Sequence, residues 1–216
     1  MPADYRKVLD YWAGKGPRPT AAEAEKGLME FANNLKLENC IYHKDVIDAM
    51  FRQVESNDTK AFASNAVGKP ILAVNYDMGR NRYAYMDKDT GNYWVSGLEG
   101  TGNQGHMFRN DGVDIGGDHG NYFVDQIESG EWMKYTVTAS RAGTYSVVLN
   151  IASTKLGGKA GVSANGAKAS EAEIPETKDR WQKVPAGKVI LKKGQNAIVV
   201  TAVDGGFKLQ SIEIER

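Results

Sequence analysis

The sequence IESGEWMKYTV, residues 127–137, alternates apolar and polar side chains along its second half. Met133, Tyr135 and Val137 are separated by single residues, and the intervening Lys134 and Thr136 are polar. Because successive side chains of a β-strand point to opposite faces, a two-residue period predicts a strand that buries one face. The same period follows the turn at residues 141–143, where its apolar members are Tyr145, Val147, Leu149 and Ile151. These segments predict a β-rich domain.

Turn signals divide the rest of the C-terminal part into further short strands. Asn165-Gly166 favours a tight hairpin turn, residues 192–195 separate two apolar runs, and a last strand is expected at 207–214. Only four of the 24 glycines precede Pro70. Short strands without a helical pattern between them predict a β-sandwich or a β-barrel, and the one-sided alternation of the longest strands favours the sandwich.

Residues 1–54 show helical periodicity instead. Apolar residues follow Asp4 at helical spacing, which predicts a first helix with Asp4 as its N-cap and Gly14 at its end. Thr20 and Glu23 form a capping box before a second apolar stripe, and a third stripe spans residues 46–54. Three short amphipathic helices are therefore expected, and their apolar faces need a surface to cover.

Composition divides the chain into three parts. We expect a helical segment at 1–54, a linker of mostly small and polar residues at 55–69, and a β-domain at 70–216. The predicted fold class is mainly β: a β-sandwich preceded by a short N-terminal α-helical segment.

Charge and composition exclude several function classes. The chain carries 27 basic and 27 acidic side chains, and no basic block indicates a nucleic acid or an acidic membrane surface as a partner. No apolar run reaches the roughly 18 residues that a membrane-spanning helix needs. The start of the chain lacks the layout of a signal peptide. Cys40 is the single cysteine, which excludes an internal disulfide and a multi-cysteine zinc site.

Motifs that suggest catalysis or metal binding have simpler structural explanations. The glycines of EGTGNQG, residues 99–105, match a dinucleotide fingerprint but lack the following helix, so a glycine-rich loop is favoured. Asp87 and Asp89 resemble the front of a calcium loop without the rest of the EF-hand pattern. A polar turn is favoured there, and a calcium site of another kind stays open. Glu128 and Glu131 fit a structural role better than glycosidase chemistry.

Aromatic residues in polar or glycine-rich segments are more informative. Trp181 lies in the polar stretch 176–182, between two expected strands, and Tyr93 and Trp94 lie in a glycine-rich stretch. Exposed aromatic rings in such loops provide flat apolar platforms for sugar rings, whose axial C–H faces are also apolar. The alternative is that these side chains close the end of the core.

Four segments together resemble family 6 carbohydrate-binding modules. They are DGVDI at 111–115, IESGEWMKYTV at 127–137, AGTY at 142–145 and GGF at 205–207, and the resemblance covers about 70–216. It implies a jelly-roll β-sandwich attached to an enzyme that degrades polysaccharides. It also implies a glycan-binding cleft formed by loops at one edge, and in some members a second site on a sheet face.

Carried over residue by residue, the resemblance keeps part of the cleft. Trp181 matches the family's cleft tryptophan. Gln126 occupies the position of the partner aromatic, while Tyr122 and Phe123 are close but out of register. Lys208 replaces an asparagine. Lys208 favours a uronate or a substituted sugar; the alternative is a cleft that no longer binds. We expect Trp181 to face Tyr122 or the loop of Tyr93 and Trp94 across an open cleft, with Lys208 at its floor.

The family's structural calcium site is not expected here. Leu72 and Val74 stand where the family has acidic ligands, and alkyl side chains cannot replace hard oxygen donors. Asp87 and Asp89 are then the remaining metal candidates, and calcium is the one cofactor left open.

The resemblance implies a non-catalytic module that targets a linked glycoside hydrolase to a polysaccharide or oligosaccharide. It further implies a monomer, without a nucleic-acid or membrane partner, in an extracellular or periplasmic location. The helical segment is then either a small bundle or the end of a hydrolase catalytic domain. Two alternatives stay open: the C-terminal part of a hydrolase with catalytic residues elsewhere, and a structural cell-surface domain with a degenerate cleft.

Overall fold

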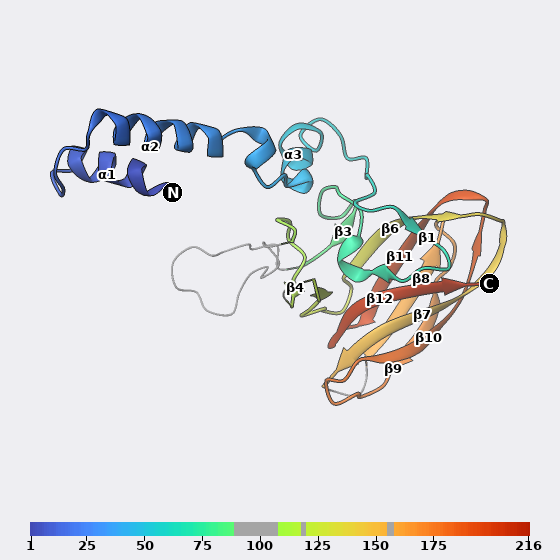
Figure 1. The fold of residues 1–216 in the computed structure, drawn as a ribbon. Coiled ribbons are helices and arrows are strands. Elements are labelled where there is room, and N and C mark those ends of the chain that lie inside the picture. Colours follow the sequence, from blue (N-terminus) through green and yellow to red (C-terminus); the bar gives the residue numbers. More distant parts are fainter. Residues whose placement is uncertain (89–107, 118–119, 155–157) are drawn as a thin grey trace. The chain divides into compact units, whose positions relative to one another are not determined.

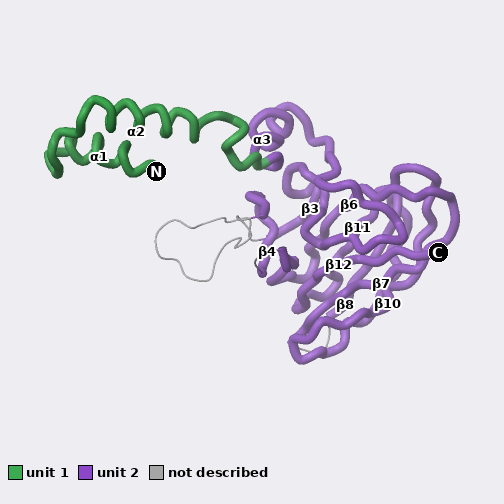
Figure 2. The backbone as a smooth tube through the Cα atoms, viewed as in Figure 1, with its two compact units in different colours: residues 1–43 green, residues 44–216 purple. Residues whose placement is uncertain are grey.

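The computed structural model describes residues 1–88, 108–117, 120–154 and 158–216 (Figure 1). The chain forms two compact units, Met1–His43 and Lys44–Arg216 (Figure 2). This division lies between the second and third expected helices, whereas composition placed the boundaries at residues 54 and 69. None of the helices in the described residues is long and apolar enough to cross a membrane.

The first unit is a helical hairpin made of α1 (Ala3–Trp12), α2 (Ala21–Asn34) and the short 3-10 helix η1 (Leu37–Asn39). The capping box before α2 is confirmed, because the Glu23 backbone N–H donates to Thr20 Oγ1 and the Thr20 N–H donates to the Glu23 carboxylate. The predicted N-cap of α1 is wrong. Pro2 takes that position, and Asp4 lies in the first turn, where its carboxylate pairs with Lys7 at 2.8 Å.

Close contact between the two helices requires a glycine. A Cβ atom on Gly27 would lie 2.4 Å from the backbone nitrogen of Tyr5. The ring of Tyr5 stacks on Phe31 with a centroid distance of 4.2 Å. Many other large apolar side chains of the unit stay exposed, among them Trp12, Met29, Leu35, Leu37 and Ile41.

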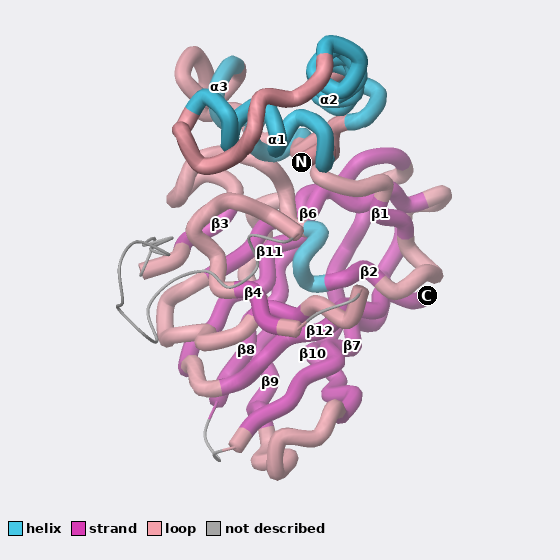
Figure 3. Tube along the Cα trace, turned by 60° about the vertical axis from the view of Figure 1, so that its left-hand side comes forward, coloured by secondary structure: helices cyan, strands magenta, loops and turns pink. Residues whose placement is uncertain are grey.

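The second unit is a β-sandwich (Figure 3). One sheet has the strand order β1-β6-β11-β8-β9, with β3 also paired to β6. Its strands are β1 (Asn65–Ala66), β3 (Tyr85–Met86), β6 (Trp132–Ala139), β8 (Gly158–Ala164), β9 (Ser170–Ile174) and β11 (Gly194–Asp204). The other sheet has the order β10-β7-β12-β5-β4, with β2 paired to β12. Its strands are β2 (Ile71–Leu72), β4 (Ile115–Gly116), β5 (Phe123–Val124), β7 (Gly143–Ser153), β10 (Gln182–Leu191) and β12 (Phe207–Glu215), and the 3-10 helix η2 (Ala73–Asn75) follows β2.

The predicted alternation places the core between the sheets. Met133, Tyr135 and Val137 of β6 are buried, as are Tyr145, Val147, Leu149 and Ile151 of β7. The Asn165-Gly166 turn after β8 is confirmed, because both residues have positive φ and the Ala167 N–H donates to the Ala164 carbonyl. The prediction of a mainly β sandwich with N-terminal helices is therefore confirmed.

Residues 44–69 form part of the sandwich unit. β1 pairs in parallel with β6, and a bridge joins Lys60 to Met78, so backbone hydrogen bonds hold much of the segment that composition marked as a linker. The helix α3 (Lys44–Phe51) binds through its acidic side: the Asp45 carboxylate accepts the Asn110 backbone N–H at 2.7 Å. Its apolar side is exposed, with Met50 at 61% and Phe51 at 66%.

A buried arginine joins this segment to the core. The guanidinium of Arg109 is fully buried, pairs with Asp111 at 2.7 Å and lies between the rings of Phe62 and Tyr76. Its Nη atoms also donate to the backbone carbonyls of residues 74, 76 and 77. Five hydrogen bonds therefore satisfy a charge that would be very costly to bury alone.

Candidate functional site

Two aromatic rings meet where the segment between β9 and β10 approaches β5. Trp181 directly precedes β10, and its side chain is 39% exposed. Its ring contacts Phe123 of β5 edge-to-face, with a centroid distance of 5.2 Å and an interplanar angle of 64°. Because the two rings touch, they form one angled apolar surface and cannot enclose a sugar between them.

The position of Phe123 depends on a glycine in the neighbouring strand. Gly116 of β4 lies opposite Phe123 in the sheet register. A Cβ atom on Gly116 would lie 2.7 Å from Phe123 Cε2, closer than real side chains come. The adjacent Val124 is buried in the core, so strand alternation directs Phe123 to the other side. The missing side chain of Gly116 provides the space for the Phe123 ring.

Lys208 of β12 lies beside this aromatic pair. Its neighbours Phe207 and Leu209 are buried, and alternation turns Lys208 outward. Lys208 Nζ lies 3.1 Å from the Asp179 carboxylate and 5.5 Å from the centroid of the Phe123 ring. The lysine is thus held by an ion pair and by a cation–π contact.

A depression of about 190 Å³ opens next to these side chains. We call it the Lys208 depression, and its lining residues are Asp125, Gln126, Ile127, Ala152, Ser153, Thr154, Asp179, Gly206, Phe207 and Lys208. Its wall carries carboxylate, amide, hydroxyl and ammonium groups. Hydrogen-bonding groups beside an aromatic surface suit a ligand with an apolar face and hydroxyl groups at its rim.

Unusual backbone conformations concentrate around the depression. Among the described residues, five that are not glycine have positive φ, and Gln126, Lys178 and Asp179 are three of these. The turn at 177–179 is held on β7, since the Ser153 N–H donates to Thr177 Oγ1 at 2.9 Å and the Asp179 N–H donates to the Ser153 carbonyl at 3.0 Å. Backbone strain that the surrounding structure maintains is typical of ligand sites.

The structure brings together some of the predicted site residues. Trp181, Lys208 and Gln126 belong to one region, and Phe123 completes it. Tyr122 does not face Trp181; its ring packs on Phe108 with a centroid distance of 4.9 Å, against the core. The expected open cleft between Trp181 and Tyr122 is therefore wrong.

Two other predicted site residues, Tyr93 and Trp94, lie outside the described residues. Phe123 was not among the predicted site residues, because its sequence position lies out of register with the family's aromatic. The glycine pair at 116–117 is the sequence signal that could have found it. A glycine without a side chain in β4 leaves space for the Phe123 ring of the neighbouring strand β5.

Comparisons with known proteins identify the kind of module that the sandwich unit contains. Residues 109–214 match the family described as "Carbohydrate binding module (family 35)". The chain contains a carbohydrate-binding module. This confirms the prediction at the level of the module, whereas the sequence resemblance pointed to family 6. The function of the module is non-catalytic carbohydrate binding. Among curated proteins, none matches this chain in sequence.

Several solved carbohydrate-binding modules are similar to this chain in structure. A family 6 module from Clostridium stercorarium in complex with cellobiose superposes with a TM-score of 0.50 at 14% identity, over 71% of this chain and 98% of its own. A module of lichenase 5A from Cellvibrio mixtus in complex with cellotriose has a TM-score of 0.47 at 21% identity, over 69% and 98%. A β-1,3-glucan-binding family 6 module from Bacillus halodurans has a TM-score of 0.47 at 16% identity, over 71% and 100%.

Within the described residues, no group of three or more His, Cys, Asp or Glu side chains could hold a metal ion. Asp87 is buried and its backbone exchanges hydrogen bonds with the Asn81 side chain, while Asp89 lies outside the described residues. At the family's calcium positions, Leu72 is 41% exposed and Val74 is fully buried.

The carboxylate pair at the start of β6 has a structural role. Glu131 is buried and accepts the backbone N–H groups of Lys88 at 3.0 Å and Glu128 at 2.9 Å. Burial raises the pKa of Glu131, while these hydrogen bonds oppose the shift. Glu128 pairs with the Lys88 side chain at 3.5 Å. Both carboxylates therefore bind Lys88, which follows β3.

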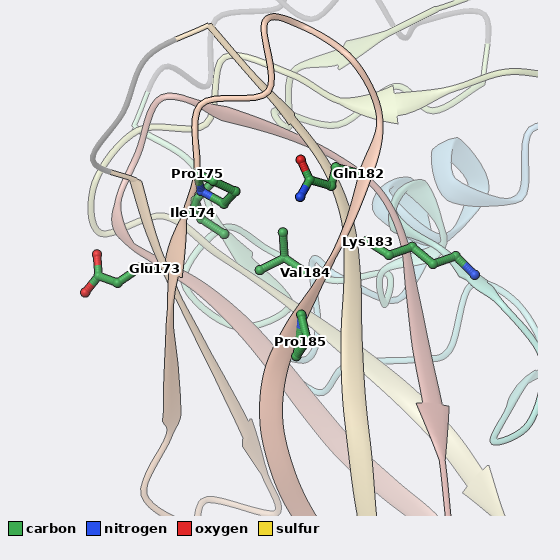
Figure 4. Close-up of a pocket in the computed structure, with 7 residues that line it drawn as sticks. All are labelled: Glu173, Ile174, Pro175, Gln182, Lys183, Val184 and Pro185. Carbon is green, nitrogen blue, oxygen red and sulfur yellow. The ribbon is translucent and has the colours of Figure 1, made fainter.

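A second depression, of about 670 Å³, lies where the end of β9 approaches the start of β10 (Figure 4). It is lined by Glu173, Ile174, Pro175, Gln182, Lys183, Val184 and Pro185. Figure 4 shows the charged ends of Glu173 and Lys183 extending away from it on opposite sides. None of these lining residues is aromatic, so this depression offers no flat platform for a sugar ring.

Proposed function

We propose that the module binds its glycan at the Trp181–Phe123 surface and the adjoining Lys208 depression. The observation that carries the proposal is the contact of the exposed Trp181 ring with the half-buried Phe123 ring beside a polar depression. A sugar ring would lie with its apolar face on the aromatic surface, and its hydroxyl groups would reach Gln126, Asp179 and Lys208. The resemblance to family 6 modules, which implies a glycan-binding cleft formed by loops at one edge, supports this location.

Affinity should be modest. The apolar surface is small, and association must offset the lost freedom of both partners, so we expect dissociation constants of roughly millimolar to micromolar, about −4 to −8 kcal/mol. One aromatic side chain should account for much of this free energy, since hot-spot residues in small interfaces contribute about 2 kcal/mol or more.

Isothermal titration of the whole chain against an oligosaccharide panel tests the site. Trp181→Ala should weaken binding about thirtyfold. Trp12→Ala is the matched control, because Trp12 is a 67% exposed tryptophan of the helical unit. Equal affinities of wild type and Trp181→Ala would refute the site. Binding of no sugar by the wild type would favour the structural domain with a degenerate cleft.

We further propose that the chain serves a linked glycoside hydrolase in an extracellular or periplasmic setting. The exposed apolar side chains support this proposal. In the helical unit Trp12, Leu35, Leu37 and Ile41 are exposed, and in the sandwich unit α3 exposes Phe51. Such faces fit the contact surface of a neighbouring domain. The chain itself should release no reducing ends from polysaccharides that it binds; a rate abolished by a single carboxylate substitution would instead establish a hydrolase.

A further inference from the structure

Lys208 forms an ion pair with Asp179. Asp179 Oδ1 lies 3.1 Å and Oδ2 lies 3.4 Å from Lys208 Nζ, so both carboxylate oxygens face the ammonium group. The side chain of Lys208 is 29% exposed and that of Asp179 is 50% exposed, so a ligand at the wall of the depression can reach both.

Asp179 is held in place by the turn that carries it. Lys178 and Asp179 both have positive φ, at 54° and 59°, and L-residues adopt this conformation at a cost. Hydrogen bonds from the turn to Ser153 maintain it. The Asp179 carboxylate is thus a fixed element of the wall, and the strained turn has the effect of placing it beside Lys208.

The charges that line the depression do not attract an anion. Lys208 is the cationic member of the lining, and Asp125 and Asp179 are the anionic members. Lys178 and Arg180 flank Asp179 in the chain but do not belong to the lining. A carboxylate that approached Lys208 would compete with Asp179 and lie near Asp125.

We infer that the Asp179–Lys208 pair makes this site selective for uncharged glycans and selects against uronate-containing ones. The inference rests on the proposed location of the site. Lys208 considered alone favours a uronate, and its pairing with Asp179 reverses that preference.

The pair also matches the chemistry of neutral sugars. An ammonium group only donates hydrogen bonds and a carboxylate only accepts them, whereas each sugar hydroxyl does both. Two neighbouring hydroxyls can therefore bind the pair together, one accepting from Lys208 and the other donating to Asp179. Such charge-assisted hydrogen bonds are stronger than those between neutral groups.

The test compares ligands that differ only at C6, where a carboxylate replaces a hydroxymethyl group. The whole chain is titrated with β-1,4-glucan, β-1,3-glucan, mannan and galactan oligosaccharides, and with the C6-oxidised form of each, in which uronic acids replace hexoses. Wild type should bind the neutral form of its ligand at least about tenfold more tightly than the oxidised form, the effect expected of one nearby like charge in a partly exposed site.

Asp179→Asn should remove this discrimination. The amide keeps the shape of the side chain, and asparagine tolerates positive φ, so the turn should persist. Affinity for the oxidised form should rise about tenfold. Affinity for the neutral form should fall about fivefold, because a neutral amide replaces the carboxylate as the acceptor of a sugar hydroxyl. Glu213→Gln is the matched control, because Glu213 pairs with the exposed Lys183 at 2.7 Å outside the lining of the Lys208 depression.

The outcomes separate the inference from the proposed function. Wild type that prefers the oxidised ligand, with loss of binding in Trp181→Ala, would overturn the charge selectivity and leave the site in place. An equal gain of uronate binding in Glu213→Gln and Asp179→Asn would also overturn the inference, since the effect would then be long-range. Neutral-sugar binding that Trp181→Ala leaves unchanged would refute the site and the inference together.

Discussion

Replacing Arg109 by alanine should destabilise the sandwich unit more than any surface substitution. The variant removes a fully buried guanidinium that donates five hydrogen bonds, two of them to Asp111 and three to backbone carbonyls. It also removes the cation between the rings of Tyr76 and Phe62, at 3.6 Å and 4.4 Å from their centroids. After both losses, the Asp111 carboxylate, the backbone carbonyls and the two rings remain without the positive charge that they contact in the wild type.

The size of the effect follows from these contacts. Removing one partner of a buried ion pair costs about 3–5 kcal/mol. The carbonyl groups add to this cost unless water enters the vacated space, so we expect a loss of about 4 kcal/mol or more in the free energy of unfolding. For a domain of this size the melting temperature should fall by about 8–16 °C.

Urea unfolding followed by tryptophan fluorescence, with thermal melts alongside, measures both quantities. Arg109→Lys keeps the charge but loses the forked geometry, so it should lie between wild type and Arg109→Ala. Arg141→Ala, an exposed arginine of the same unit, should change stability by less than about 0.5 kcal/mol. A loss below about 1 kcal/mol in Arg109→Ala would refute the reasoning and show that the cluster is replaceable.

Two further substitutions test Gly116, which lies beneath the Phe123 ring, and the buried Tyr85. Gly116→Ala should displace the Phe123 ring, because the added Cβ would lie 2.7 Å from it, and weaken sugar binding about tenfold in titrations. Gly161→Ala, where the added Cβ meets nothing closer than 3.5 Å, should bind normally; equal affinities of the two variants would contradict the role of Gly116. Burial raises the pKa of Tyr85 to about 12, so the unfolded state loses this proton first as the pH rises above 10. Stability should then fall by about 2 kcal/mol by pH 12 on account of this residue. Tyr85→Phe should lose less stability than wild type over that range in urea titrations, whereas Tyr83→Phe, at a 47% exposed tyrosine, should follow wild type.

Local patterns predicted the elements of the fold well. The two-residue period of β6 and β7 arises because water and core lie on opposite faces of a strand, so the buried residues could be named in advance. The capping box of Thr20 and Glu23 depends on atoms three residues apart and was likewise readable. The positive φ of Asn165 and Gly166 follows from the chemistry of the turn itself.

Packing between distant segments was not readable in the same way. The apolar stripe at residues 46–54 predicted a face turned toward a core. In the structure, α3 is instead attached through Asp45, whose carboxylate accepts the backbone N–H of Asn110, and Met50 is exposed. The segment at 55–69 has the composition of a linker, but the sheet edge at β6 pairs with Asn65 and Ala66.

The sequence by itself determined the longest strands and the residues that they bury, because strand alternation depends on neighbours along the chain. Through the family resemblance it also named three members of the candidate site, Trp181, Gln126 and Lys208. Tertiary structure decided what surrounds that tryptophan. Phe123 of β5 contacts Trp181, which lies just before β10. Lys208 pairs with Asp179, which is 29 positions away in the chain. Strand pairing brings such residues together, and it depends on the whole sheet rather than on any local pattern. For that reason the sequence pointed to a lysine that attracts anions, and the folded chain contains a lysine already paired with an aspartate.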